Sequence, residues 1–545
     1  MKKLLALFLL CVLLTLSVTA ACARRTPAVS TQTNDESGNA ERESSVSAMS
    51  SNAAEVSLAD SFGETGISDG AVSAPGDAEP ETPEELLLSQ LGAHDFGART
   101  FRIYAIDEGG VYDRAQFTAD ETAPGTVSAA AAERNACIAE LFNCKLETDY
   151  AEDCTTYFEN VRAEQLAGIM ERTILAAGAS VMGDLTAFGW LYDLREIENS
   201  YLSLDAPYWD QQMIDSQSLG GRLFCITGDA VLTDDEQVGV LFYNRTLLAT
   251  ASGEDPYALV QNGEWTIDTL ARLCRDAYDA GAAGLICREY STDYFMPALG
   301  ADIVCKDEND LPYPADSSAL YEAFRSVFEL MYDDAVEVEF QGDSRPLLDC
   351  GAEDLSAPAL ARFYDGSTAF LVSAFGDLDA EAVAGMELGL LPLPKADAEG
   401  QYRTPADVHG FTMLALPLGN APWELSDLTV LMEALALYNS EYVTSVYRSE
   451  TLRRYGLTDE TDREMFELIQ SARTADLGAV YRYDMPPFYR YASIAAEDGK
   501  NGPIESMGDV QPNPPDPIAT ATDNMAAFAE MIANDLQYCI DLYND

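Results

Sequence analysis

The chain has 545 residues, enough for more than one hydrophobic core, and 47% of them are hydrophobic, as is usual for a globular protein. Its 92 Asp and Glu outnumber 32 Lys and Arg, so the formal net charge is −60 at pH 7. Such an acidic surface repels phosphate groups, which argues against nucleic acid as a partner and against docking on an anionic membrane through protein charge.

The N-terminus predicts export. Lys2 and Lys3 precede an apolar run, residues 4–18, that has signal-peptide length and is short for a spanning helix. The run ends in "TAAC", and small residues before a cysteine resemble a bacterial lipobox. Residues 1–21 are therefore predicted to be a lipoprotein signal peptide and Cys22 the lipidated first residue. Ordinary cleavage after Ala21 without a lipid is the alternative.

A polar stretch follows the predicted lipid anchor. From Ala23 to about Pro83 the chain is dominated by Ser, Ala, Asn, Thr, Glu and Gly, and large apolar residues are scattered singly. Such a segment cannot bury enough surface to offset its chain entropy. Residues 22–93 are predicted to be a disordered tether.

Strands and helices alternate from His94 onward. Phe101, Ile103 and Ala105 have the period of a first strand. Residues 128–150 predict a helix and then a strand, residues 159–178 a second helix, and residues 179–185 a short strand. This alternation is typical of a parallel α/β sheet flanked by helices.

A similar alternation begins at "GVLFYNRTLL", residues 239–248, which predicts a buried strand, a polar turn and the start of a helix. Thr266 is a plausible N-cap for a helix within residues 264–281, and Trp265 is expected to fix that helix start against a sheet. Strands are predicted over residues 368–375 and 386–394. Further helices are predicted over residues 319–335, 426–447 and about 523–542.

Several stretches, in this order, carry a family resemblance: "DAPYWDQQMIDSQSLGGRLFCITGDAVLTDDEQVGVLFYNRTLLA", "DPYALVQNGEWTIDTLARL", "GSTAFLVSAFGDL", "MELGLLPLPKAD" and "SARTADLGAVY". Behind a lipobox, they resemble the bacterial extracellular solute-binding proteins of family 1. These are lipoprotein receptors of carbohydrate-type ABC importers, related to maltose-binding protein. The resemblance covers most of residues 96–481.

The resemblance implies a two-lobed periplasmic-binding-protein-like fold of type II, in which a ligand closes two α/β lobes about hinge strands. Lobe 1 is expected over residues 94–243 and 389–450, and lobe 2 over 244–388 and 451–545. The first crossing, the hinge, is expected at Phe242, Tyr243 and Asn244, and the second near residues 388–394. An ordinary strand–turn–helix within one domain fits the local pattern equally well.

Catalytic signatures are scarce. The chain has two histidines, His94 and His409, which argues against a histidine-based metal site. It contains no GxSxG, HExxH or GxxxxGK[ST] motif. Counting residues leaves a paired-carboxylate hydrolase open, because Asp and Glu are abundant throughout. Neither a metal nor a cofactor is expected.

Aromatic side chains next to polar ones suggest a sugar site, because sugar rings stack on aromatic faces and their hydroxyls need polar partners. The predicted strand ending near Gly183 puts Trp190 on a loop that, by resemblance, borders the ligand. Packing under the next helix is the alternative. Tyr208 and Trp209 are consecutive, so one of them is expected to face the ligand. Phe375 aligns with a loop where sugar-binding relatives often carry Trp.

Three further positions complete the candidate ligand site. Asp229 precedes the first crossing and could accept hydrogen bonds from hydroxyls, or form a turn. His409 follows the second crossing and either lies near the hinge or caps a loop. Tyr481 begins a tyrosine-rich stretch, residues 480–491, that could form a wall of the site or a packed surface loop.

The sequence thus predicts a monomeric, lipid-anchored protein on the extracellular face of the cell membrane. It is expected to capture a small solute, for which a carbohydrate is the favoured hypothesis, and to deliver it to the membrane subunits of an ABC permease. It is not expected to be an enzyme. The alternatives are a surface glycan hydrolase and a solute-binding sensor lipoprotein with no transport role.

Overall fold

The computed structural model describes residues 82–107, 114–118, 125–288, 293–340, 343–345, 359–481 and 517–544, all of them within one unit, Ala78–Asp545. The predicted signal peptide, Cys22, and the tether up to residue 81 lie outside the described residues. So does the tyrosine-rich stretch after Tyr481. Within the described ranges, no helix has the length and hydropathy needed to cross a bilayer.

The last part of the predicted tether is folded, which corrects the boundary at residue 93. Helix α2 (Pro83–Leu91) starts with a capping box, in which the Thr82 hydroxyl accepts from Glu85 N and the Glu85 carboxylate accepts from Thr82 N. Leu87 and Leu91 are buried, and α2 packs against helix α14 (Pro422–Tyr442). A cap and an apolar face are enough to order these residues.

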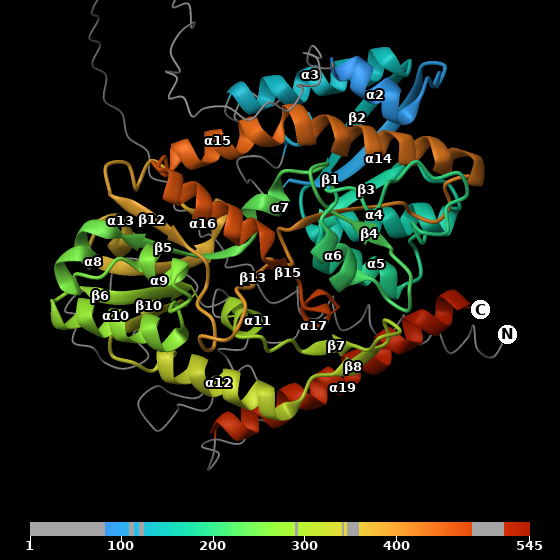
Figure 1. The fold of residues 1–545 in the computed structure, drawn as a ribbon. Coiled ribbons are helices and arrows are strands. Elements are labelled where there is room, and N and C mark those ends of the chain that lie inside the picture. Colours follow the sequence, from blue (N-terminus) through green and yellow to red (C-terminus); the bar gives the residue numbers. More distant parts are fainter. Residues whose placement is uncertain are drawn as a thin grey trace, which may run out of the picture. The chain divides into compact units, whose positions relative to one another are not determined.

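The first sheet has five strands in the order β2-β1-β3-β14-β4 (Figure 1). They are β1 (Arg99–Ile106), β2 (Cys144–Ala151), β3 (Ile174–Gly178), β4 (Cys225–Ile226) and β14 (Thr412–Ala415). Strand β1 is parallel to β2 and β3, whereas β14 is antiparallel to both β3 and β4. We call this sheet and its helices the first half. The helices are α2, α3 (Gly125–Leu141), α4 (Cys154–Ala167), α5 (Ala179–Ala187), α6 (Gln211–Gln217), α14 and α15 (Thr444–Arg454).

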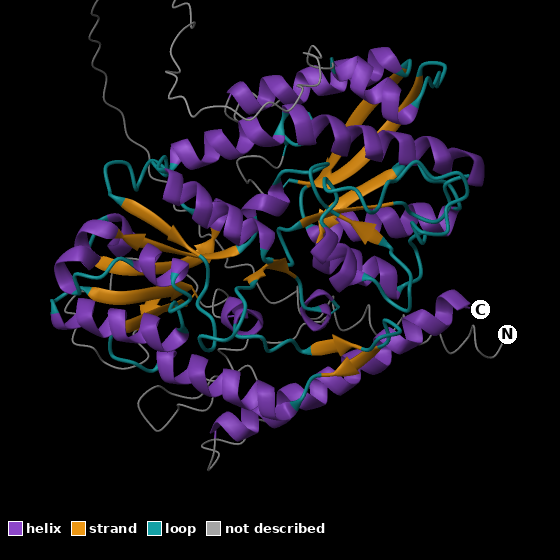
Figure 2. Cartoon of the chain, in the orientation of Figure 1, coloured by secondary structure: helices purple, strands orange, loops and turns teal. Residues whose placement is uncertain are grey.

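The second sheet has six strands in the order β10-β9-β6-β11-β5-β12. They are β5 (Gly239–Asn244), β6 (Ala283–Arg288), β9 (Val336–Phe340), β10 (Asp343–Arg345), β11 (Thr368–Ala374) and β12 (Leu388–Leu391). With its helices it forms the second half (Figure 2). These are α8 (Arg245–Ala251), α9 (Pro256–Gln261), α10 (Ile267–Asp279), α11 (Phe295–Ala298), α12 (Ser317–Met331), α13 (Ala359–Tyr364), the 3-10 turn η2 (Phe375–Asp377) and α16 (Glu460–Ser471).

Each sheet contains one strand that arrives from the other half. The chain leaves β4, passes through the short helix α7 (Thr233–Glu236), and enters the second sheet as β5, which lies antiparallel between β11 and β12. It returns between β12 and β14, through β13 (Thr404–Pro405). The two changes of sheet therefore lie within residues 227–238 and 392–411.

This position corrects the predicted first crossing. Phe242, Tyr243 and Asn244 form the second part of β5; Phe242 and Tyr243 are paired on both sides, with β11 and β12, and Asn244 is paired with β12. All six residues of β5 are buried, which explains the unbroken apolar run, and the Asn244 side chain then caps α8 by accepting from Leu247 N at 3.0 Å. The connection that could bend precedes these residues.

The region around β3 also differs from the sequence prediction. The predicted helix over residues 159–178 ends as α4 at Ala167, where Gly168 adopts a left-handed conformation, and Ile174 opens β3. The predicted strand over residues 179–185 is helix α5. A short apolar run has no periodicity that separates a buried strand from a buried helix.

A further set of elements connects the halves: the hairpin β7 (Val304–Lys306) and β8 (Pro312–Pro314), β15 (Arg473–Thr474) paired with β13, α17 (Leu477–Val480), and the long helix α19 (Pro517–Asn544). One hydrophobic cluster runs from Tyr104 and Leu175 of the first sheet through β5 to the core of the second sheet. A second cluster fills the other face of the first sheet, where Phe101, Ile103 and Ala105 are buried as their alternation predicts.

The start of α10 is tied to the chain that leaves β12. Trp265 is fully buried, its indole Nε1 donates to Pro392 O at 2.9 Å, and Thr266 caps the helix by accepting from Thr269 N. This confirms the structural role that the sequence predicted for Trp265.

We expect Trp265→Phe to lower the free energy of unfolding by about 2–4 kcal/mol, because it leaves Pro392 O without its donor and removes buried volume. Trp423, which is 67% exposed on α14, provides the matched control. Urea denaturation followed by circular dichroism measures both variants. A Trp265→Phe midpoint equal to that of Trp423→Phe contradicts the assignment.

Candidate functional site

The two changes of sheet define one edge of each sheet. Strands β1, β3 and β4 end at this edge of the first sheet, and β14 begins there, opposite Gly178. In the second sheet, β6, β11 and β12 end at the corresponding edge and β5 begins there. We call these the crossing edges. Ligands of open α/β sheets bind at the carboxyl ends of the strands, so the crossing edges are the first place to seek a site.

On the first half, His409 and Ser180 meet at the crossing edge. The Ser180 hydroxyl lies 3.2 Å from Nδ1 of His409, which is exposed. The loop that carries His409 packs directly on the end of β3, since a Cβ on Gly178 would lie 1.8 Å from His409 O. The first N–H groups of α5 donate to Phe411 O and Val408 O of that loop, so backbone carbonyls already occupy this helix N-terminus.

Asp407 links this loop to the second half. One carboxylate oxygen accepts from His409 N at 3.0 Å and the other from the Tyr294 hydroxyl at 2.6 Å, while Asp407 N donates to Gln237 O at 2.8 Å. Tyr294 follows β6 and packs on the start of β5, where a Cβ on Gly239 would lie 2.6 Å from its ring. The crossing edges thus combine an imidazole, a carboxylate and hydroxyls, the groups that hydrogen-bond a polyol.

This arrangement does not have the geometry of a serine hydrolase. In such enzymes a carboxylate accepts from the second ring nitrogen of the histidine and holds its tautomer. Here Asp407 accepts from the backbone N–H of His409, and its other oxygen is engaged by Tyr294. Among the described residues, no hydrogen bond to the remaining ring nitrogen of His409 is seen. The set suits ligand binding better than nucleophile activation.

A buried charged cluster lies where the chain passes from β4 to β5. We call it the crossing cluster; it comprises Asp210, Asp229, Asp234, Asp235, Arg448 and Arg473. Arg473 of β15 contacts Asp235 at 2.8 Å and Asp234 at 3.2 Å, both on α7. Its Nε also lies 2.8 Å from an Asp210 oxygen, although the angle is not that of a hydrogen bond. Arg448 of α15 donates to Asp235 at 2.7 Å.

The crossing cluster has four carboxylates and two guanidinium groups, so it would carry two excess negative charges if all were ionised. Burial raises the pKa of Asp229 to about 6, and burial likewise raises the pKa of Asp234 well above its ordinary value. Holding protons on these groups relieves the excess charge. The cluster fixes α7, α15 and β15 together at the change of sheet.

Trp190 does not lie at the crossing edge. Strand β3 ends at Gly178, and the nine residues of α5, about 13 Å of helix, separate it from Trp190. Leu191 pairs with Pro417, just beyond the end of β14 at the opposite edge of the sheet. The Trp190 ring packs 5.0 Å from Phe188 and 5.4 Å from Phe158. The prediction failed because it took α5 for part of a strand.

Tyr208 and Trp209 share one buried partner. The Tyr208 hydroxyl donates to Glu433 Oε1 at 2.6 Å, and the indole of the fully buried Trp209 donates to Glu433 Oε2 at 2.9 Å. Both side chains are therefore engaged by one carboxylate, and the expectation that one of these consecutive aromatics faces a ligand stays a prediction. Glu433 stands alone in the apolar run "LTVLMEALALYN", and this isolated charge was the sequence signal for a buried acceptor.

Phe375 and Tyr481 are core residues. Phe375 is fully buried, with its ring 5.1 Å from Phe466 and 5.3 Å from Tyr455. Tyr481 is also buried, and its hydroxyl is hydrogen-bonded to Thr186. Asp229 belongs to the crossing cluster, where its carboxylate accepts from the Thr444 hydroxyl at 3.1 Å. Of the seven predicted ligand residues, the structure brings His409 to the crossing edge with an exposed side chain.

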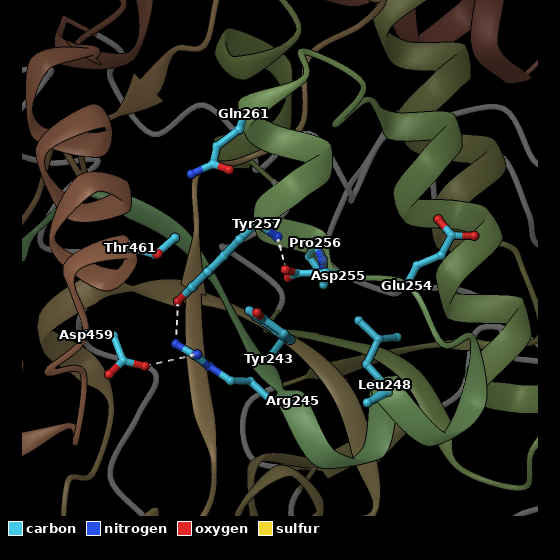
Figure 3. Close-up of a pocket in the computed structure, with 11 residues that line it drawn as sticks. Tyr243, Arg245, Leu248, Glu254, Asp255, Pro256, Tyr257, Gln261, Asp459 and Thr461 are labelled. Atoms are coloured by element: carbon cyan, nitrogen blue, oxygen red, sulfur yellow. Dashed lines mark hydrogen bonds and ion pairs between the residues drawn. The ribbon is translucent and has the colours of Figure 1, made fainter.

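A pocket of about 330 Å³ lies at the far end of β5, between α8, α9 and the start of α16 (Figure 3). Its lining comprises Tyr243, Arg245, Leu248, Ala249, Glu254, Asp255, Pro256, Tyr257, Gln261, Asp459 and Thr461. Arg245 donates to the Tyr257 hydroxyl at 2.9 Å and is paired with Asp462. The Tyr257 hydroxyl in turn donates to Asp462 at 2.6 Å. The Arg245 guanidinium is therefore already paired within the protein, by Tyr257 and Asp462.

No family model and no curated protein matches this sequence. Solved structures with a similar fold include the sugar-binding protein MalE from Xanthomonas citri, with 12% identity and a TM-score of 0.52, covering 81% of this chain and 99% of that chain. UspC of M. tuberculosis has 17% identity and a TM-score of 0.47, covering 79% and 100%. A family 1 extracellular solute-binding protein from Bifidobacterium longum subsp. infantis has 13% identity and a TM-score of 0.46, covering 82% and 100%.

The likeness to the X. citri protein shows that the chain has the two-lobed α/β fold of the periplasmic binding proteins. This confirms the fold that the sequence predicted. It also confirms, at the level of the fold, the resemblance to solute-binding proteins.

The raised pKa of Asp229 predicts a pH-dependent stability. As the pH falls from 7 through about 6 toward the ordinary value of 3.8, the folded protein takes up a proton that the unfolded chain does not, so stability rises. A shift of this size corresponds to at most about 3 kcal/mol.

We therefore expect Asp229→Asn to be more stable than the wild type at pH 7.5 and to lose that advantage as the pH is lowered to 4.5. Melting temperatures across this range measure the difference. Asp149→Asn, at an exposed position on β2, is the control. A difference between wild type and Asp229→Asn that does not change with pH contradicts the assignment.

Proposed function

We propose that this chain is a lipid-anchored extracellular protein that captures a small solute, a carbohydrate, and presents it to the membrane subunits of an ABC importer. The observation that carries the proposal is the fold, two α/β halves that each receive a strand from the other, because it is similar to the fold of a protein named as sugar-binding. Fold alone does not fix function. The groups at the crossing edges supply the additional argument.

The proposed site is the crossing edge around His409, Ser180 and Asp407. Sugar hydroxyls both donate and accept hydrogen bonds, so they need carboxylate, imidazole and hydroxyl partners held in fixed positions. The close approach of the His409 loop to Gly178 and its contact with Tyr294 hold these groups in place. No bond is made or broken in this proposal, since in the described part of the chain no carboxylate accepts from a ring nitrogen of His409 to orient it for proton transfer.

The proposed motion is a rotation of the two halves about residues 227–238 and 392–411, with the ligand enclosed at the crossing edges. The proposed lobes are residues 94–243 with 389–450 and residues 244–388 with 451–545, except that β5 and β12, which lie in the second sheet, are assigned to the second lobe. Phe242, Tyr243 and Asn244 serve in this view as the anchor of the hinge connection rather than as its bending point.

Calorimetry with a panel of maltodextrins, other oligosaccharides and amino acids tests the ligand class. We expect saturable binding of an oligosaccharide, weakened about tenfold by His409→Ala and by Ser180→Ala, because each variant removes a hydrogen bond worth about 1–1.5 kcal/mol. His94→Ala, which changes the chain's other histidine, is the control. Binding of amino acids without sugars, or equal sugar affinity in all variants, contradicts the proposal.

The lipid anchor is tested separately in the intact bacterium. We expect the wild-type chain in the membrane fraction and the Cys22→Ala chain released into the aqueous fraction, because that change removes the residue that would carry the lipid. Cys11→Ala, within the apolar run, is the control and should leave the chain on the membrane. Equal membrane retention of all three chains argues against lipidation of Cys22.

A further inference from the structure

A hairpin and a helix tie the two halves together away from the changes of sheet. We call the β7–β8 hairpin and helix α19 the strap. The hairpin follows β6 and α11 of the second half, and α19 is the last described element of the chain. The two lie side by side, and α19 also packs along α12 of the second half (Figure 1).

Both parts of the strap reach the same segment of the first half. This segment, residues 215–224, contains the end of α6, the turn at Gly220 and Gly221, and the approach to β4; we call it the socket. Gly220 and Gly221 have φ angles of 57° and 80°, the left-handed region that glycine adopts without strain. The turn at these two glycines reverses the chain, so that the end of α6 and the approach to β4 lie close together in the socket.

The hairpin docks through Lys306 and Asp310. The Lys306 ammonium donates to the carbonyl of Asp215 and, at 2.9 Å, to that of Ser218, so it satisfies the carboxyl end of α6. Asp310 accepts from Gly220 N at 2.9 Å through its carbonyl and from Gly221 N at 3.0 Å through its carboxylate. Lys306 and Asp310 also pair with each other at 2.6 Å.

The end of α19 docks beside it through Tyr543. The Tyr543 ring lies 4.2 Å from that of Phe224, and its hydroxyl donates to Thr186 O at 3.4 Å. Arg222, which pairs with Asp193, donates to Tyr543 O at 3.2 Å and closes the last turn of the helix. Ile540 packs against Gly220, where an added Cβ would lie 3.0 Å away.

The other face of α19 is anchored in the core. Met525, Ala529, Ile532 and Leu536 are buried and belong to the hydrophobic cluster that includes the core of the second half. Their spacing of three and four residues places them on one stripe of the helix. The strap is therefore held along the body of α19 by apolar packing and, at the socket, by a small number of polar contacts together with Tyr543 and Ile540.

We propose that the strap restrains the motion between the two halves, and that its docking at the socket sets how freely they rotate. The purpose of such a restraint rests on the proposed function, because it controls the closure that would enclose a ligand. Its physical basis does not, since the contacts join the halves whatever the ligand is. The socket is the detachable end, because it is held by fewer buried apolar groups than the body of α19.

The test measures the distance between the halves in the full chain without ligand. Spin labels on unnatural residues at Glu159 of α4 and Asp279 of α10, both exposed, report a distance distribution by pulsed electron resonance. Lys306→Met with Tyr543→Ala removes the Lys306 ammonium and the Tyr543 ring from the socket and leaves the contacts of Asp310 and of the Tyr543 carbonyl in place. We expect the distribution to broaden, and the amides of residues 217–223 to exchange at least about tenfold faster with deuterium, as protection by the strap is lost.

The matched control is Lys145→Met with Tyr538→Ala. Lys145 is exposed on β2, and Tyr538 is 58% exposed on α19, little more than one turn before Tyr543. This pair should leave both measurements at their wild-type values. An unchanged distance distribution in the docking variant overturns the restraint, and unchanged exchange at the socket overturns the assignment of the docking contacts. Neither result depends on a ligand, so failure of the solute-binding proposal remains distinguishable.

Discussion

The exchange of one strand between the halves constrains everything else in this structure. Strand β5 comes from the first half and lies between β11 and β12, whereas β14 comes from the second half and lies between β3 and β4. Removing either strand would leave backbone donors and acceptors of two neighbours without partners in a buried sheet. The halves therefore cannot separate, and any large motion between them has to be a rotation about the connections that precede β5 and β14.

Charge imbalance explains how the change of sheet is stabilised. With 92 acidic and 32 basic side chains, a buried cation has to serve several carboxylates. Arg473 contacts three of them, and Arg448 shares Asp235 with it. Replacing Arg473 would leave the buried Asp210 and Asp234 without their counter-ion, a larger loss than that of an exposed ion pair. Proton uptake by Asp229 and Asp234 also reduces the excess negative charge that the shortage of cations leaves in the crossing cluster.

The sequence was sufficient where a pattern was long and periodic. Three predictions agree with the structure: helix α10 with its Thr266 cap, the strand β5 and the buried Trp265. An amphipathic stripe, a helix cap or a fully apolar strand is each compatible with one kind of structure. It was insufficient at residues 174–187, where strand β3 and helix α5 are both apolar and follow each other directly. Trp190 was misplaced for that reason alone.

Side-chain direction set the other limit. An aromatic residue next to polar ones fits a ligand site and a buried hydrogen bond equally well, and Tyr208 and Trp209 take the second option because Glu433 lies between them. Phe375 is likewise enclosed by Phe466 and Tyr455, which follow it by about 80–90 residues in the chain. Such contacts depend on tertiary placement. By contrast, the capping box at Thr82 and Glu85 is a pattern that the sequence itself shows, and it places the start of the folded part near residue 82 instead of residue 94.

The continuous core and the strap together bear on how tightly such a protein can bind. For a ligand that binds one arrangement of the halves and not the others, the apparent association constant is the intrinsic constant multiplied by the fraction of the protein already in that arrangement. Apolar contacts that run from Tyr104 through Phe242 restrict the halves near the changes of sheet, and the socket restricts them at a second place. Two separated points of attachment oppose rotation more strongly than one, because a rotation that relaxes the first displaces the second. Under the proposed function, apparent affinity would then depend on residues such as Lys306 and Tyr543, which lie in the strap and outside the proposed site, and it would change while the binding groups stay the same.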